Sequence, residues 1–313
     1  MRAVVMDEFG GPEVLRVRSV EDPAPGPGQV LIAVQYASVT FVETQVRAGA
    51  GPFGRPALPR VPGNGVGGRI VAAGPEADPA LVGTLVVSTT GGVGGYAELA
   101  LAQARDVVAV PAGLDLADAV ALLADGRTAV LLHGQAEVKP GERVLVEAAG
   151  GGVGSLLTQL AAASGAHVIG AARGAAKSSL VLSLGAAAYV DYGQPGWEEQ
   201  ARDLDLVFDG VGGELGTRAA ALLRDGGRIS VYGMASGAEA EIDRDRVRVL
   251  GLTGPPGPAE QHALITEALT LAAEGRLRPV IGQTFPLDQA AAAHQAIETR
   301  ATTGKTLLTV SAS

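Results

Sequence analysis

The sequence predicts an α/β protein with two domains, one rich in β-strands and one built on an open, doubly wound parallel sheet. The chain has 313 residues, which is enough for two domains. Short apolar runs between Gly and Pro clusters fill residues 1 to about 118, whereas strands alternate with helices from residue 143 onward. A glycine-rich turn at 148–154 joins the first strand of this second part to a helix.

The composition narrows the class of protein. Apolar residues make up 47% of the chain and charged residues 18%, so the chain can bury a large core. The net charge of −9 disfavours nucleic acid and anionic membranes as partners. Absence of cysteine excludes disulfides, thiol nucleophiles and cysteine-based zinc sites. The N-terminus lacks the apolar stretch of a signal peptide, so we expect a cytoplasmic protein.

One uncharged stretch, 148–172, has enough residues to span a bilayer as a helix. It contains three consecutive glycines and several polar residues, which favour a buried strand, turn, helix and second strand instead. We therefore expect no membrane partner.

The first part of the chain predicts β-strands separated by turns. The expected strands are Ala3–Met6, Val14–Val17, Val30–Val34, Arg69–Ala73 and Leu85–Ser88. The proline-rich segment 49–65 is expected to be a surface loop.

The second part predicts crossover connections and a parallel sheet. Its expected strands are Val144–Ala148, His167–Ala171, Ala188–Asp191, Asp205–Asp209, Arg228–Tyr232 and Val247–Leu252, with helices at about 153–164, 175–184 and Glu260–Glu274. A final helix, Leu287–Arg300, and a strand, Lys305–Val310, are expected to return to the first domain. The expected domains are therefore 1–119 with 263–313, and 120–262.

The glycine-rich turn predicts a dinucleotide site. In such a turn one glycine bends the chain, another lets backbone amides approach a pyrophosphate, and a third allows close packing of helix and strand. Here Gly151, Gly152 and Gly154 stand between an apolar strand and a helix with one apolar face, which is formed by Leu156, Leu157, Leu160 and Ala161. The helix N-terminus would supply N–H donors to phosphate. The alternative is a tight turn that holds no ligand.

A second phosphate motif is not supported. Residues 303–306 read Thr-Gly-Lys-Thr, but Thr299 stands where a P-loop needs its first glycine, and a strand is expected to follow.

The end of the second parallel strand predicts which coenzyme is preferred. An NAD site usually has a carboxylate about 20 residues after the glycines, where it binds the ribose 2′-hydroxyl. This chain has Arg173 and Lys177 instead, with no acidic residue before Asp191. Two cations favour a 2′-phosphate, so we expect NADP(H). The alternative is a solvated basic start of a helix.

Several motifs together resemble a known family. They are VPGNGVGG (61–68), GGYAEL (94–99), GRTA (126–129), PGERVLV (140–146), AAGGGVG (148–154) and TGK (303–305). In this order they resemble the zinc-free quinone oxidoreductase branch, with its zeta-crystallin-like enzymes, of the medium-chain dehydrogenase/reductase superfamily. The resemblance implies a GroES-like domain formed by both chain ends, a Rossmann domain between them, and an active site in the cleft. It also implies hydride transfer from NADPH to a quinone or an activated C=C bond, and a homodimer.

The resemblance also implies site residues. It places Lys177 and Tyr192 at the adenosine 2′-phosphate and Thr128 against the nicotinamide ring. The expected cofactor contacts are Ala149, Gly151, Gly152, Val153, Gly154, Arg173, Lys177, Tyr192, Thr128, Gly210, Tyr232 and Gly233.

The substrate side is expected to include four candidate catalytic residues and three pocket residues. The candidate catalytic residues are Thr40, Thr128, Asp125 and Glu43. Asp125 and Glu43 are candidate proton donors, with surface or capping roles as the alternative. The pocket residues are Phe41, as an apolar wall, with Asn64 and Tyr96, for which loop packing is the alternative.

The chain departs from the family pattern near this pocket. Thr40 and Glu43 stand where the family usually has Asn and Asp, and Gln45 matches a tyrosine of some bacterial members. Gly65 replaces a common glutamate beside Asn64. These changes alter the polar wall of the expected substrate pocket.

No metal site is expected, because the histidines share no ligand spacing; they are His133, His167, His262 and His294. Hydride addition to an enone or quinone needs no metal when the cofactor carries the chemistry. Two alternatives stay open. One is a dedicated reductase of a biosynthetic enone or ketone, such as a polyketide intermediate. The other is an NADPH-binding structural or regulatory protein with little catalysis.

Overall fold

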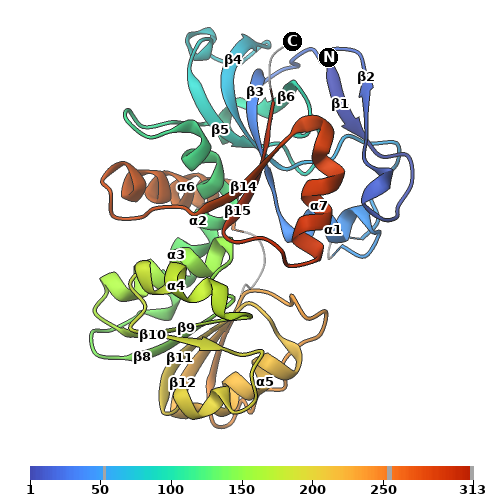
Figure 1. Cartoon of the computed structure of the whole chain (residues 1–313). Helices are drawn as coiled ribbons and strands as arrows, with labels where there is room; N and C mark the ends of the chain where they lie inside the picture. The colour runs from blue at the N-terminus through green and yellow to red at the C-terminus, as the bar shows by residue number, and fades with distance from the viewer. Residues whose placement is uncertain (52–53, 252–255, 311–313) are drawn as a thin grey trace. The chain divides into compact units, whose positions relative to one another are not determined.

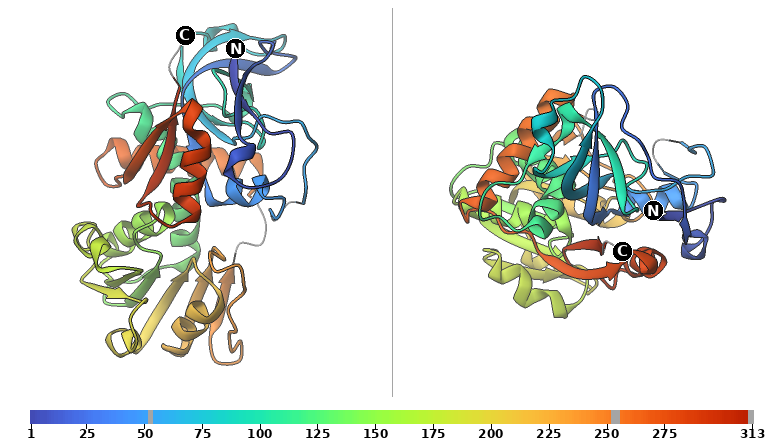
Figure 2. Two further views of the ribbon diagram at one scale, coloured as in Figure 1. Left: turned by 45° about the vertical axis from the view of Figure 1, so that its right-hand side comes forward. Right: turned by 90° about the horizontal axis from the view of Figure 1, so that it is seen from above.

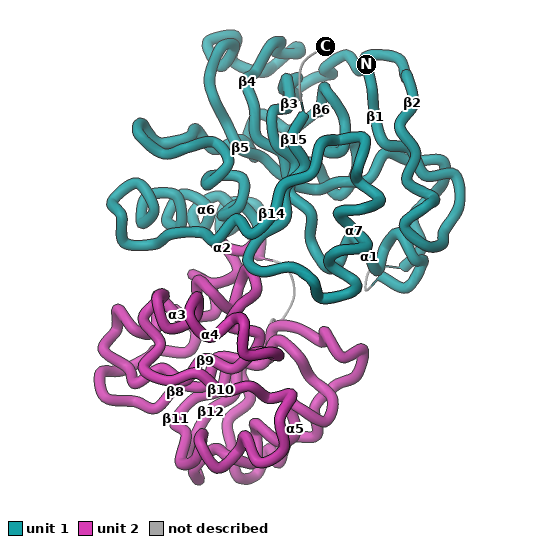
Figure 3. Tube along the Cα trace, viewed as in Figure 1, with its two compact units in different colours: residues 1–124, 258–313 teal, residues 125–257 magenta. Residues whose placement is uncertain are grey.

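The computed structural model describes residues 1–51, 54–251 and 256–310. The chain forms two compact units, Met1–Ala124 with Pro258–Ser313 (unit 1) and Asp125–Gly257 (unit 2), shown in Figure 3. Each boundary lies five residues from the expected one, at 124 against 119 and at 257 against 262. The chain enters unit 2 from unit 1 and then returns.

Unit 2 is built on a six-stranded sheet in the order β10-β9-β8-β11-β12-β13 (Figure 1). Every strand pair in it is parallel, which confirms the predicted doubly wound sheet. The strands are β8 (Arg143–Glu147), β9 (His167–Ala172), β10 (Ala188–Asp191), β11 (Leu204–Asp209), β12 (Leu223–Val231) and β13 (Arg248–Gly251). The strand order reverses between β8 and β11. In folds of this kind ligands bind at the carboxyl ends of the strands beside such a reversal.

Helices connect these parallel strands. They are α3 (Gly152–Ala163), α4 (Ser178–Ser183) and α5 (Gly213–Ala221), with the 3₁₀ turns η4 (Ala175–Lys177) and η5 (Trp197–Gln200). The predicted apolar face of α3 is confirmed, since Leu156, Leu157, Leu160 and Ala161 are all buried. Trp197 lies in a hydrophobic core of unit 2 together with Val190 and Leu204.

Unit 1 is built mainly from antiparallel strands. A seven-stranded sheet has the order β14-β15-β3-β4-β5-β7, with β6 paired to β3, and β1 and β2 form a separate pair. The strands are β1 (Arg2–Val5), β2 (Arg16–Ser19), β3 (Gln29–Val39), β4 (Gly65–Ala73), β5 (Leu85–Thr89), β6 (Leu99–Gln103), β7 (Val108–Ala109), β14 (Ile281–Pro286) and β15 (Lys305–Thr309). β15 runs antiparallel to β3, with Thr306 opposite Val39. This pairing confirms that the C-terminal strand returns to the first domain.

The helices of unit 1 are α1 (Phe41–Arg47), α6 (Pro258–Ala273) and α7 (Ala290–Glu298), and α2 (Leu116–Ala136) crosses the boundary between the units. The short 3₁₀ turns are η1 (Pro12–Val14), η2 (Pro79–Leu81), η3 (Ala104–Asp106) and η6 (Leu287–Gln289). Figure 2 shows α7, in red, beside the C-terminal strands β14 and β15. Its residues Ala290 and Ala293 belong to the same buried core as Val4 and Ile32.

The expected strands Val14–Val17 and Val247–Leu252 have other bounds in the structure. The expected strand Val14–Val17 is divided into η1, which Pro12 opens, and β2. Pro has no N–H to give to a ladder, and its fixed φ suits the first position of a helical turn. The expected strand Val247–Leu252 ends at Gly251 in the structure, and Leu252 lies outside the described residues. The proline-rich segment also has two such residues, 52 and 53.

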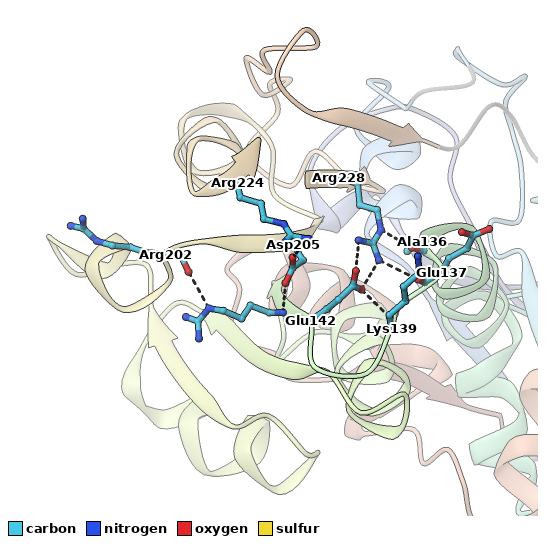
Figure 4. Close-up of polar contacts among 9 residues, drawn as sticks. Ala136, Glu137, Lys139, Glu142, Arg202, Asp205, Arg224 and Arg228 are labelled. Carbon is cyan, nitrogen blue, oxygen red and sulfur yellow. Dashed lines mark hydrogen bonds and ion pairs between the residues drawn. The ribbon is translucent and has the colours of Figure 1, made fainter. Parts of the chain in front are cut away.

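A buried arginine closes the C-terminus of α2 (Figure 4). Arg228 Nε donates to the carbonyl of Ala136 at 2.7 Å, and its Nη2 donates to that of Glu137 at 3.2 Å. The same guanidinium donates to both carboxylate oxygens of Glu142, at 2.9 and 2.7 Å. A helix end leaves carbonyls without intrahelical donors, and Arg228 supplies two of the missing bonds.

Among residues 1–51, 54–251 and 256–310, no helix is long and apolar enough to cross a membrane.

Candidate functional site

The glycine-rich turn has a backbone that requires small residues. Ala148 follows β8 with a φ of +50°, a left-handed conformation that is costly for a residue with a side chain. The amide of Gly151 donates to the carbonyl of Ala148 at 2.8 Å and closes the turn. A Cβ on Gly154 would lie 2.3 Å from the same carbonyl oxygen, so no side chain fits there. This close approach of α3 to β8 is the packing that the sequence predicts for the third glycine.

The start of α3 is suited to an anion. Its N-cap is Gly151, which has no side chain to bond the first-turn amides. These amides and the helix dipole therefore face the region in front of the turn. Asp125 lies against this first turn, because a Cβ on Gly152 would be 1.9 Å from its Oδ2. Thr128 follows three residues later on α2, so the two predicted residues share a face of that helix.

The structure brings Lys177 to the glycine-rich turn. A Cβ on Gly150 would lie 2.9 Å from Cδ of Lys177 and 3.5 Å from its Cγ, so the aliphatic stem crosses that glycine. Arg173 follows β9 and is exposed, with its Nη1 3.7 Å from a Cβ built on Gly193. Both cations thus lie at the carboxyl ends of β9 and β10. Tyr192 lies in the same region, and its amide donates to the carbonyl of Ala172 at 3.3 Å.

Asp191, the last residue of β10, lies beside Arg173 at the carboxyl ends of β9 and β10, although the sequence assigns it no role. Its Oδ1 accepts hydrogen bonds from the amides of Gly174 and Gly193, both at 2.9 Å. The Gly174 amide and then Gly193 and Arg173 hold the pKa of Asp191 below its ordinary value. Asp191 therefore stays ionised at neutral pH, and it fixes the loop that carries Arg173.

The loops after β11 and β12 form another part of this end of the sheet. The amide of Tyr232 donates to the carbonyl of Asp209 at 2.9 Å, and its hydroxyl donates to the carbonyl of Glu147 at 3.0 Å. A Cβ on Gly210 would lie 2.6 Å from the Tyr232 hydroxyl, and one on Gly233 would lie 2.7 Å from the Gly210 carbonyl oxygen. The predicted residues Gly210, Tyr232 and Gly233 therefore pack against one another beside the turn.

The two remaining predicted cofactor residues, Ala149 and Val153, lie in the glycine-rich turn and at the start of α3. Ala149 is fully buried, and its amide donates to the carbonyl of Ala171 at 3.0 Å. Val153 lies in the first turn of α3.

In unit 1 Thr40 and Glu43 form a helix cap. Thr40 is the N-cap of α1, and its hydroxyl accepts from the amide of Glu43 at 3.3 Å. In return the Glu43 carboxylate accepts from the Thr40 amide at 2.6 Å. This reciprocal arrangement is a capping box. It favours the capping alternative over the proton-donor role for Glu43.

The same carboxylate organises two neighbouring loops. It accepts from the amide of Asn64 at 2.8 Å and contacts the hydroxyl of Tyr96 at 3.3 Å. Burial raises the pKa of Glu43 above its ordinary value, although the bonds from Thr40 and Asn64 act in the opposite direction. Asn64 also accepts from the amide of Gly92 through its Oδ1, at 2.7 Å. Asn64 thus links two loops, which is the packing role foreseen as its alternative.

Tyr96 lies in the interior rather than at a surface. It is 0% exposed, and its hydroxyl lies 3.1 Å from Nε2 of His294, which is also 0% exposed. Burial, with a smaller contribution from Arg47, lowers the pKa of His294 to about 3, so this imidazole is neutral. Full burial favours the packing alternative for Tyr96. Phe41, in contrast, is exposed at the start of α1, where an apolar wall is expected.

Replacing Glu43 with Ala is expected to lower the free energy of unfolding by about 1–3 kcal/mol, because the partly buried amides of Thr40 and Asn64 lose their acceptor. Urea unfolding measures this loss. Unchanged stability with a reduced turnover number would contradict the capping role and restore the proton-donor role.

The described residues hold no group of three or more His, Asp or Glu side chains that could bind a metal ion. His133 lies 2.9 Å from the hydroxyl of Ser164, and His294 is paired with Tyr96. His167 begins β9, as expected.

Comparison with known proteins gives consistent matches along the chain. A family profile described as alcohol dehydrogenase GroES-like domain matches residues 26–112, and one described as zinc-binding dehydrogenase matches 184–308. The chain is 36% identical to quinone oxidoreductase of Homo sapiens, over 98% of this chain and 97% of that protein. It is 31% identical to 2-haloacrylate reductase of a Burkholderia species, over 98% of each.

A solved structure agrees with these matches. Quinone oxidoreductase of Escherichia coli, complexed with NADPH, superimposes with a TM-score of 0.89 at 27% identity, over 99% of this chain and all of that one. Unit 1 is thus the GroES-like domain and unit 2 the Rossmann domain. The protein is an oxidoreductase that belongs to the zinc-free quinone oxidoreductase branch of the medium-chain dehydrogenase/reductase superfamily.

Proposed function

We propose that this protein uses NADPH to reduce a quinone or an activated C=C bond without a metal ion. The observation that carries the coenzyme choice is the position of Lys177, whose stem crosses Gly150 of the glycine-rich turn. Arg173 adds a second cation at the same end of the sheet. A ribose 2′-phosphate placed there would meet two positive charges, whereas a 2′-hydroxyl would gain much less.

The residues of unit 2 fit a dinucleotide. The uncapped first turn of α3 offers backbone amides to the pyrophosphate, and Gly154 and Gly210 leave no space that a side chain could fill. Lys177, Arg173 and Tyr192 would hold the adenosine end. When bound, NADPH supplies a hydride, which is two electrons with one proton, and the acceptor takes a further proton from water or a protein acid.

The acceptor class follows from the named relatives. Several are quinone oxidoreductases, and one is a 2-haloacrylate reductase, whose name specifies a C=C bond activated by a carboxylate and a halogen. Both substrates accept hydride at an electron-poor carbon. The protein has to stabilise the negative oxygen that develops, through donors positioned before the reaction. We propose Thr128 for contact with the nicotinamide end and Thr40 with Phe41 for the substrate side.

Oxidation of NADPH, followed by absorbance with a panel of acceptors, tests this function. The panel contains 1,2- and 1,4-naphthoquinone, simple enones and 2-chloroacrylate. Turnover of a quinone supports the proposal, and turnover of enones alone supports a dedicated enone reductase. Tight NADPH binding without turnover of any acceptor would contradict an enzymatic role and support a binding protein.

We also propose a homodimer on the basis of the family resemblance. Light scattering during size-exclusion chromatography tests it, and a mass of one chain would contradict it.

A further inference from the structure

Two acidic residues end neighbouring strands at the point where the strand order of unit 2 reverses. Glu147 is the last residue of β8 and Asp209 the last residue of β11. The register pairs Val146 with Phe208, so these two acids come next on adjacent parallel strands. Both are 0% exposed. Burying a carboxyl group costs free energy unless its oxygens are hydrogen-bonded.

The hydrogen bonds of the two carboxyl groups are unequal. Oδ1 of Asp209 accepts from the amides of Val211 and Gly212, at 2.8 and 2.7 Å. Among the described residues, Oδ2 of Asp209 and both carboxyl oxygens of Glu147 have no N–H or O–H donor. Three acceptor oxygens without a donor would be costly if both groups were ionised, because each buried charge would also repel the other. One proton shared by the pair removes the repulsion and gives Oδ2 of Asp209 a donor, and the oxygen of Glu147 that still has no donor then belongs to a neutral group.

We propose that Glu147 is a neutral acid whose O–H donates to Asp209, and that this acid pair positions the loops of the nucleotide site. The negative charge belongs to Asp209, since its two amide donors stabilise the ionised form. Burial, reinforced by Asp209, raises the pKa of Glu147 well above its ordinary value, in agreement with this assignment. The inference rests on the proposed nucleotide site and deepens it.

The pair is connected to both loops that flank the site. Glu147 directly precedes Ala148, the strained first residue of the glycine-rich turn, and its carbonyl accepts from the hydroxyl of Tyr232. Asp209 holds the turn at Val211 and Gly212. A Cβ on Gly216 of α5 would lie 2.4 Å from Oδ2 of Asp209, so α5 leaves that carboxylate no room to retreat. Ionisation of Glu147 would therefore push the two loops apart.

The charged and titratable groups around the pair do not compensate an ionised Glu147. Tyr232 faces it from the end of β12, and burial, with Glu147 and Asp209, raises the pKa of this phenol well above its ordinary value. Tyr192 and Asp125 also raise the pKa of Tyr232, which is the effect of negative charge, so neither supplies a cation to the pair. The side chain of Lys177 lies over Gly150, and Arg218 of α5 bonds Glu198 instead.

The pH dependence of stability, measured without nucleotide, is the first test. A carboxyl group whose pKa is raised on folding retains its proton while the unfolded chain loses it. From the ordinary pKa of glutamate upward, the ratio of folded to unfolded protein should therefore fall by up to about tenfold per pH unit relative to a chain without this acid. In Glu147→Gln the amide NH₂ still donates to Asp209, and this one-proton slope should disappear.

A matched control is Glu199→Gln, which alters an exposed acid of the same unit and should leave the slope unchanged. If Glu147→Gln retains the full slope of the native chain, the proton is not on Glu147 and the proposal is overturned. Infrared spectroscopy of the native chain requires no variant. It should show the carbonyl band of a buried protonated carboxyl at neutral pH, and its absence would also overturn the proposal.

Binding of NADPH, followed by its fluorescence, tests the positioning role. Glu147→Leu has no donor for Asp209, so its dissociation constant should rise about 10- to 100-fold. Glu147→Gln should restore tight binding and retain it at alkaline pH, where binding by the native chain weakens. Equal affinity of the Leu variant and the native chain would overturn the positioning role. If the native chain binds no NADPH at any pH, the proposed function fails, while the pH slope still decides where the proton resides.

Discussion

The double substitution Arg173→Ala, Lys177→Ala is expected to weaken NADPH binding by about 10²- to 10⁴-fold and NADH binding only slightly. Each charge-assisted hydrogen bond to a phosphate contributes about 1.5–3 kcal/mol, and the double variant removes two cations from the expected 2′-phosphate position. The two single variants should differ in how much they weaken NADPH binding. Asp191 lies beside Arg173 and already offsets part of its charge, so Lys177→Ala should have the larger effect.

Dissociation constants for both coenzymes, from fluorescence titration, measure this preference. Arg202→Ala is a matched control, because Arg202 is an exposed arginine of unit 2 whose side chain points away from the sheet in Figure 4. It should leave both affinities unchanged. Equal losses for NADPH and NADH in the double variant would show that the two cations do not bind the 2′-phosphate. Higher salt should reduce the preference of the native chain, since both cations are near the surface.

The parallel sheet of unit 2 could be predicted because its strands carry a local signal. Short apolar runs such as 144–146 and 206–208 indicate strands buried on both faces, and the glycines between β8 and α3 indicate the crossover. The sequence does not predict strand β14 (Ile281–Pro286), because its alternation is weak and it includes Gly282 and Pro286. Strand β2 begins two residues later than expected, since Pro12 opens a 3₁₀ turn before it.

Residues of the candidate site that depend on local chain geometry could also be predicted. Gly154 and Lys177 follow from the strand, turn and helix pattern around them. The acid pair could not, because Glu147 and Asp209 are 62 residues apart and meet only through the register of β8 and β11. One signal was present: Glu147, Asp191 and Asp209 each end a parallel strand, and such ends meet at the same edge of the sheet. The contact between Tyr96 and His294 could not be predicted either, since the two residues are far apart in the sequence.

Replacing Arg228 with Ala is expected to lower the free energy of unfolding by about 3–5 kcal/mol, the usual cost of breaking a buried ion pair. The variant would leave the largely buried carboxylate of Glu142 without its two guanidinium bonds. It would also leave the carbonyls of Ala136 and Glu137 at the end of α2 without a donor. Urea unfolding at neutral pH measures the loss.

Arg224→Ala is a matched control, because Arg224 is an exposed arginine of the same region that pairs with one oxygen of Asp205, while the other oxygen keeps the Arg143 amide as its donor (Figure 4). Its removal should cost no more than about 1 kcal/mol. The pH dependence of stability also distinguishes Arg228→Ala from Arg224→Ala. Burial alone would raise the pKa of Glu142, but the bonds from Arg228 and the Lys139 amide outweigh it and lower the pKa. A carboxylate with a lowered pKa stabilises the folded state above its ordinary pKa, and the contribution is lost as the pH falls through the folded value. The difference in stability between the native chain and Arg228→Ala should therefore narrow in acid. A constant difference down to the lowest measurable pH would mean that Arg228 acts mainly through the helix carbonyls.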